Sequence, residues 1–243
     1  VIGLLWRLEL HNRRNLAILF FTMVVVMMGF GMVIPILPFY IESFGASGAG
    51  LGILMAIFSI MQFIFAPIWG GYSDRYGRKP MLLIGALGNA ISLLLFGLST
   101  ELWMIYASRA LGGMLSAATL PTAMAYISDT TETKNRGGGM GIIGAAMGMG
   151  MVIGPGIGGL LAGDALSTPF FVGSGLSILA LFLILLFLPE SLPSHNRVHD
   201  VHIKGLEIKQ IWQALVGPLG YLMVLAFFVF FGLTNFEGIF GLY

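Results

Sequence analysis

Long apolar runs alternate with short polar connectors along the whole chain. Crossing the hydrocarbon core of a bilayer as a helix takes about 20 mostly apolar residues. Seven runs approach or exceed this length, at residues 16–40, 48–72, 80–98, 101–127, 138–162, 168–188 and 213–242. Because backbone groups in lipid must be hydrogen-bonded within their own segment, these runs predict helices, and the short connectors between them predict helical hairpins. The pattern therefore predicts an all-α membrane protein.

Outside the predicted spans, basic residues lie in alternate connectors only. They precede the first run or lie between the second and third, the fourth and fifth, and the sixth and seventh: Arg7, Arg13, Arg14, Arg75, Arg78, Lys79, Lys134, Arg136, Arg197, Lys204 and Lys209. The opposite connectors contain Glu42, Glu101 and Asp164 but no lysine or arginine. Because basic connectors stay on the cytoplasmic side, this distribution predicts a multi-pass protein of the cell membrane with a cytoplasmic N-terminus.

Composition supports a lipid environment and excludes several kinds of site. Only 9% of the residues are charged, against about 25% in soluble domains. The absence of cysteine excludes disulfides and thiolate metal sites. His195, His199 and His202 lie close together, but no carboxylate pattern completes a ligand set, so a solvated loop is the better interpretation. We expect no metal and no cofactor, and the net charge of +1 gives no reason to expect nucleic-acid binding.

One long polar segment divides the chain. We predict a cytoplasmic N-terminal segment (residues 1–15), a six-helix transmembrane bundle (16–188), a cytoplasmic linker (189–212) and a seventh transmembrane helix (213–243). A single span after a long linker is typical of the start of a second bundle. We therefore expect these residues to be part of a longer protein.

Three polar side chains lie within the predicted spans. A charge at the bilayer centre costs about 2.5–3.5 kcal/mol on insertion scales, so Arg109 and Glu237 are candidate functional residues. Arg109 could instead bind backbone carbonyls of neighbouring helices as a structural residue, and Glu237 could point to water near a helix end. For Gln62, a hydrogen bond to a neighbouring helix and contact with a substrate remain equally open.

Glycines are concentrated in the fifth predicted span. Gly150, Gly154 and Gly158 recur every four residues and share one helix face. Small residues at this spacing allow two helix backbones to approach closely. Pro155 lies within this row and removes a backbone donor, so we expect a kink or a looser segment there.

Several segments resemble motifs of the major facilitator superfamily, in the order that the family requires. The segment from Gly71 to Pro80 resembles the loop signature between the second and third helices. Gly150-x-x-x-Gly154-Pro155-x-x-Gly158-Gly159 resembles the antiporter motif of drug exporters, and residues 102–113 are similar to the fourth-helix arginine motif. Residues 29–38 and 232–237 are similar to segments of twelve-helix drug:proton antiporters, the multidrug exporters of the NorA and Bmr type.

The resemblance implies a fold and a function. It implies two six-helix bundles, each built of 3+3 inverted repeats, which rock about a central cavity. It implies proton-coupled efflux of amphipathic, often cationic, drugs, with small molecules, protons and the lipid bilayer as partners, by a protein that works as a monomer when full length. The candidate residues are Glu237 and Arg109 for proton coupling, Gln62, Glu237 and Phe240 for substrate, Gly71, Asp74, Arg75, Gly77, Arg78 and Lys79 for the gating loop, and Gly150, Gly154, Pro155, Gly158 and Gly159 for the antiporter motif.

Other functions are weighed against this one. An exporter of one physiological solute, such as a sugar, a metabolite or a lipid-linked glycan, is the alternative that the motifs leave open. An intramembrane enzyme would need a nucleophile and a base, or metal ligands, within the spans, and the spans contain no histidine or carboxylate cluster. A sensor or scaffold that transports nothing would not need Glu237.

Overall fold

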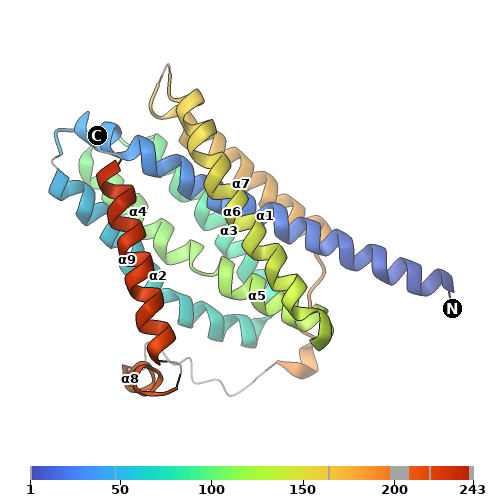
Figure 1. Ribbon diagram of the computed structural model, residues 1–243. Helices are drawn as coiled ribbons and strands as arrows, with labels where there is room; N and C mark the ends of the chain where they lie inside the picture. The colour runs from blue at the N-terminus through green and yellow to red at the C-terminus, as the bar shows by residue number, and fades with distance from the viewer. Residues whose placement is uncertain (1, 47, 164, 198–207, 219, 241–243) are drawn as a thin grey trace. The chain divides into compact units, whose positions relative to one another are not determined.

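A computed structural model describes the backbone of residues 2–46, 48–163, 165–197, 208–218 and 220–240, and excludes the side chains of residues 2–12, 196, 208–211, 230 and 233–240. The described residues form helices and connectors without a strand. The helices are α1 (Ile2–Glu42), α2 (Gly48–Tyr76), α3 (Arg78–Gly97), α4 (Leu102–Ser116), α5 (Thr119–Thr130), η1 (Thr133–Asn135), α6 (Arg136–Leu161), α7 (Thr168–Phe187), η2 (Ser194–Asn196), α8 (Ile208–Val216) and α9 (Gly220–Phe240) (Figure 1). They belong to two compact units that divide between Ile203 and Lys204.

The first unit contains six helical segments long and apolar enough to cross a membrane, as found among the described residues: Arg13–Glu42, Gly48–Tyr76, Arg78–Gly97, Leu102–Thr130, Thr133–Leu161 and Thr168–Phe187. The first six predicted spans correspond to these segments. The fourth is two helices rather than one, because α4 ends at Ser116 and α5 begins at Thr119. Pro121 has no N–H to donate to the carbonyl of Ala117, which weakens the helix at this point.

Helix packing in this unit follows a pseudo-symmetric pattern. The first span, α1, packs mainly against α6 and α7, and the fourth span packs through α4 against α2 and α3. If each of the first three spans is exchanged with the span three places later, the α1–α6 and α1–α7 pairs become the α4–α2 and α4–α3 pairs. The α3–α7 pair is unchanged by this exchange. Since successive spans alternate in direction, spans three apart run oppositely, so this pattern is that of two inverted three-helix repeats.

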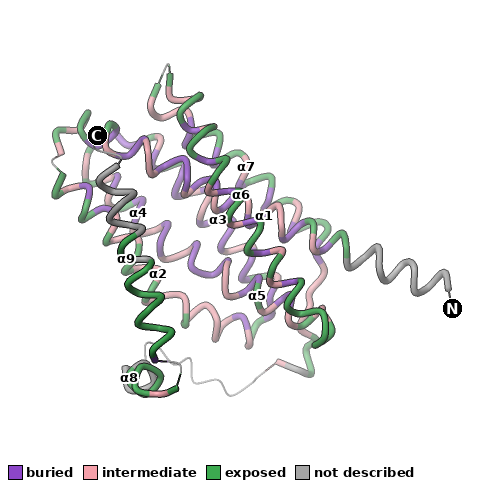
Figure 2. Tube along the Cα trace, viewed as in Figure 1, coloured by how far each residue is buried: buried purple, intermediate pink, exposed green. Residues whose placement is uncertain are grey.

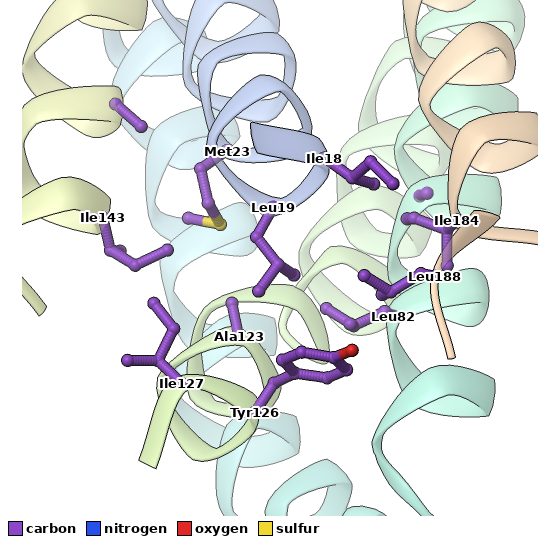
Figure 3. Close-up of a cluster of buried hydrophobic side chains, with 12 residues drawn as sticks. Ile18, Leu19, Met23, Leu82, Ala123, Tyr126, Ile127, Ile143, Ile184 and Leu188 are labelled. Atoms are coloured by element: carbon purple, nitrogen blue, oxygen red, sulfur yellow. The ribbon is translucent and has the colours of Figure 1, made fainter. Parts of the chain in front are cut away.

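Two apolar clusters form the core of the unit, one toward each end of the bundle. One contains Ile18, Leu19, Met23, Leu82, Ala86, Ala123, Tyr126, Ile127, Ile143, Ala146, Ile184 and Leu188 (Figure 3). The other includes Tyr40, Phe96 and Phe170, and the Tyr40 hydroxyl donates to the Phe96 carbonyl over 3.0 Å. The least buried spans are α2 and α6, with 11% and 22% of their most apolar windows buried, and most of α2 is intermediate or exposed in Figure 2. These two spans correspond to each other in the repeat pattern.

The second unit differs from the prediction of one span over residues 213–242. Residues up to Val216 belong to α8, and α9 begins only at Gly220. Pro218 lacks the N–H that a continuous helix would need and disfavours helical geometry at the residue before it. The apolar run therefore contains a sharp break that hydropathy alone does not reveal.

Candidate functional site

The predicted gating loop is mostly helical. α2 continues to Tyr76 and α3 begins at Arg78, so Gly77 alone connects the two helices. Gly77 has φ 110°, in a region that residues with a side chain rarely adopt. The loop expected over residues 71–80 is thus a joint of one residue. The positive φ of Gly77 is sufficient to turn the chain from α2 into α3.

Arg78 is the centre of a charge cluster at this joint. Its guanidinium donates to Asp74 Oδ1 over 2.5 Å, to Asp129 Oδ2 over 2.9 Å and to Ser73 Oγ over 3.1 Å. Arg78 is 8% exposed, whereas the side chain of Asp74 is 51% exposed. The guanidinium therefore joins the end of α2, the start of α3 and the end of α5 at one point, with its charge balanced by two carboxylates.

Glu190 completes the cluster from the chain segment that follows α7. Its carboxylate accepts hydrogen bonds from the backbone N–H groups of Arg78 (2.8 Å) and Lys79 (3.2 Å), which open α3. It also accepts from the N–H groups of Ser191 (3.0 Å) and Leu192 (3.1 Å). A carboxylate at a helix N-terminus satisfies unpaired donors and complements the helix dipole. A Cβ at position 77 would overlap this carboxylate, which is a second reason for glycine there.

We expect Glu190→Gln to lower the thermal stability of the full-length protein and slow its transport. The amide can accept from fewer of the four N–H groups, and a lost charge-assisted hydrogen bond costs about 1–3 kcal/mol. Thermal unfolding in detergent and initial transport rates measure both effects. The matched control is Glu132→Gln, because Glu132 is exposed in the connector before η1. Equal behaviour of the two variants would contradict the importance of the Glu190 cap.

The other gating candidates are less central. The guanidinium of Arg75 lies 5.4 Å from the ring centre of Tyr76, on an exposed side chain. Lys79 donates through Nζ to the carbonyl of Leu185 over 2.8 Å. Gly71 lies half-buried within α2. Sequence reasoning missed Asp129 and Glu190. Both are acidic residues at the span ends where the basic residues gather, and this opposite charge is the signal that could have identified them.

Arg109 lies on α4 and is 5% exposed. Its guanidinium carbon is 5.3 Å from the ring centre of Phe58 on α2 and 5.1 Å from that of Phe96 on α3. Within the described part of the chain, its Nε and Nη2 atoms have no hydrogen-bond partner. Two aromatic faces offset part of the cost of burying this cation, but an unpaired charged donor remains expensive. The side chain is therefore able to bind an acceptor, and hydrogen bonds from these two atoms to backbone carbonyls are not present among the described residues.

The antiporter motif combines a buried glycine row with exposed residues. Gly150, Gly154 and Gly158 are buried against α1, and a Cβ at Gly154 would lie 2.7 Å from the Met28 carbonyl oxygen and 2.9 Å from the Cα of Gly31. Pro155 and Gly159 are exposed. The helix α6 runs through Pro155 without interruption. The glycine row thus brings the backbones of α1 and α6 together. Pro155 lies at the edge of this contact, since its Cδ would be 3.2 Å from a Cβ on Gly31 of α1.

The remaining candidates are placed only in part. Gln62 is half-buried on α2. Glu237 and Phe240 lie in the last turns of α9, but their side chains lie outside the described residues. Among the described residues, no group of three or more histidine, aspartate or glutamate side chains could hold a metal ion.

The comparison with protein families identifies the fold. The family model for the Major Facilitator Superfamily matches residues 19–243. The chain belongs to this superfamily. Its helices correspond to the N-terminal half of the superfamily fold. Together with its six apolar helices, this membership makes the chain a multi-pass, membrane-embedded protein.

Relatives and solved structures support this assignment. The chain is 36% identical over 222 residues to multidrug resistance protein 2 of Bacillus subtilis and 37% identical over 230 residues to multidrug resistance protein 1 of the same organism. These matches include 90% and 94% of this chain, but only 55% and 58% of the length of the two relatives. The quinolone resistance protein NorA of Staphylococcus aureus is 29% identical over 230 residues, with 95% of this chain and 58% of NorA covered.

Among solved structures, the human organic anion transporter MFSD10 (TETRAN) matches with a TM-score of 0.69 and 26% identity, over 83% of this chain and 52% of that one. An inward-facing bacterial homologue of the human lysosomal transporter Spinster matches with a TM-score of 0.69 and 18% identity, over 74% of this chain and 43% of that one. The chain therefore spans about half the length of the proteins that it matches.

Proposed function

We propose that the full-length protein is a proton-coupled exporter of amphipathic, often cationic, drugs and acts by alternating access. The observation that carries this proposal is Arg109, a buried cation with two donor atoms that have no acceptor among the described residues. Burying a charge in the membrane is costly, and proteins that accept this cost usually use the charge for function. The substrate class rests on the multidrug and quinolone resistance relatives.

The geometry also supports a place for the second bundle. α2 and α6 are equivalent in the two repeats and leave the most surface uncovered. Both carry apolar exposed residues, such as Phe63 and Val152. We propose that these two faces contact the second bundle and that the Arg78 cluster holds the first bundle rigid while the two bundles rock. Alternating access by rocking requires each bundle to move as a rigid body against the other.

We further propose that the N-terminus and the Arg78 cluster are cytoplasmic. The ends of α2, α3, α5 and α7 meet at this cluster, together with the basic residues of their connectors. Single cysteines at Thr100 and Ser194, both exposed, distinguish the two sides. In intact cells, a membrane-impermeant maleimide should label the Thr100 site only. Labelling at Ser194 in sealed cells would reverse the proposed orientation.

Proton coupling is assigned to Glu237 together with Arg109. A carboxylic acid in a low-dielectric cavity could be protonated when the cavity faces the exterior and release its proton toward the cytoplasm, and a cationic substrate would favour the ionised form. Proton and drug would then compete for one site. Arg109 would provide a fixed positive charge that stabilises the ionised form of Glu237 or of another carboxylate in the second bundle.

Transport in everted vesicles tests the function and the coupling together. We expect an imposed pH gradient to accelerate transport of several chemically different fluorescent cations, and Glu237→Gln to remove this acceleration while the protein still inserts, because the amide mimics the protonated acid. Zwitterionic quinolones and an organic anion complete the substrate panel. Movement of one solute class only would favour the single-solute exporter, and gradient-driven transport by Glu237→Gln would exclude Glu237 as the coupling residue.

A further inference from the structure

The two helices of the second unit meet at a sharp joint. α8 ends at Val216 and the N–H of Gly220 donates to the Gly217 carbonyl over 2.9 Å, which closes a turn around Pro218. A Cβ at Gly220 would overlap the carbonyl of Leu215, so the last turn of α8 is seated against the first residue of α9. In Figure 1, α8 is seen end-on whereas α9 runs along the picture, so α8 lies crosswise to α9.

α8 has an apolar stripe that no described residue of the second unit covers. Trp212, Leu215 and Val216 fall within an arc of about 100° around the helix and are 67%, 38% and 71% exposed. Gln213 and Ala214 occupy the rest of this turn. In the sequence, isoleucine at positions 208 and 211 continues the same i, i+3, i+4, i+7 spacing, while positions 209 and 210 are lysine and glutamine. α8 is therefore amphipathic, in contrast to the apolar α9.

The joint determines which apolar partner lies within reach of this stripe. α9 has 21 residues and is long enough to cross a bilayer. Because α8 is seated on the first residue of α9, it lies at the level where α9 enters the membrane. A helix that lies crosswise to a spanning helix at this level runs along the bilayer surface, with room for its apolar face in the acyl boundary and for its polar face in water. Tryptophan is enriched at this boundary.

We propose that α8 is an interfacial anchor that inserts the face formed by Trp212, Leu215 and Val216 into the lipid surface beside the entry point of α9. The occupant of this face is lipid, and the attraction is mainly apolar, because the nine residues of α8 include one charged residue, a lysine. The anchor fixes the start of the second bundle at the membrane surface. This inference rests on membrane insertion of α9 and does not require the proposed substrate or proton coupling.

Spin labels in the full-length protein in liposomes test the anchor. These 243 residues contain no cysteine, so a single cysteine can be introduced at position 212, 213, 214, 215 or 216 once any cysteine elsewhere in the protein has been replaced. Power saturation then compares collisions with oxygen, which concentrates in lipid, and with a polar nickel chelate. We expect oxygen to dominate at 212, 215 and 216 and nickel to dominate at 213 and 214.

Two other patterns would overturn the proposal. Low access to both reagents at 212, 215 and 216 would show that the second bundle covers the stripe, and high nickel access at all five positions would show a solvated helix. A second variant separates anchoring from simple folding. Leu215→Glu should abolish the oxygen preference of a label at 212, whereas Ala214→Glu, in the same turn but outside the stripe, should preserve it. An unchanged preference in Leu215→Glu would contradict the anchor. Transport is measured separately, so loss of export leaves this result interpretable.

Discussion

Gly154→Leu should abolish transport by the full-length protein while the variant still inserts into the membrane. Even a Cβ at this position would lie 2.7 Å from the Met28 carbonyl oxygen and 2.9 Å from the Cα of Gly31, and both of these are backbone atoms that cannot move aside alone. A leucine side chain would force α6 away from α1, which is the main packing partner of α6. Overpacking of this kind costs about 1–3 kcal/mol or more.

A matched pair of alanine variants isolates the cause. Gly154→Ala and Gly156→Ala make the same chemical change two residues apart in α6. Apart from the backbone of α6 itself and the adjacent residues, no atom of the described residues lies within 4 Å of a Cβ at Gly156. We expect Gly154→Ala to lower the thermal midpoint and the transport rate, and Gly156→Ala to leave the midpoint unchanged or raise it, because alanine favours helix over glycine. Wild-type transport by a well-expressed Gly154→Leu protein would refute close packing at this position.

Arg109→Met should abolish proton-coupled transport without lowering the stability of the protein. The substitution loses two cation–aromatic contacts, each worth about 0.5–2 kcal/mol. It also removes a buried cation whose Nε and Nη2 lack partners in the described part of the chain, which offsets that loss. A residue that costs stability yet is required for activity is expected at a functional site. Thermal unfolding in detergent and gradient-driven transport measure the two effects separately.

Arg78→Met is the control, because Arg78 and Arg109 are the two buried arginines among the described residues of the bundle. Its removal leaves Asp74 and Asp129 without their common partner, and losing such charged hydrogen bonds costs about 1–3 kcal/mol. The same substitution should therefore destabilise the protein at position 78 and not at position 109. An equal loss of stability at both positions would show that Arg109 is a structural residue, and retained gradient-driven transport would exclude it from coupling.

The sequence was sufficient for features that depend on local pattern. The first six spans follow from apolar length, and Arg109 stands out because a cation interrupts an apolar run. Gly154 is recognisable from its spacing to Gly150 and Gly158. In each case the physical constraint acts between neighbours along one helix, so it leaves a period or an interruption that can be read directly.

Features that depend on tertiary contacts were not predicted. Glu190 caps a helix that begins at Arg78, a residue 112 positions away, and no local pattern links the two. Likewise, the contact of Gly154 with Gly31 of α1 identifies a partner that spacing alone does not specify. The break at Pro218 was missed for a different reason, since hydropathy averages over a window and one proline does not lower the average enough to end a span.

The Glu190 cap also holds the chain that leaves α7 against the first unit. The backbone N–H groups of Ser191 and Leu192 are bound to the same carboxylate as the start of α3, so the chain beyond α7 stays attached to the first bundle for several residues. Between Leu192 and Ile208 the chain can extend by at most about 55 Å. This covalent reach is an upper limit on the distance between the Glu190 cap and the start of α8.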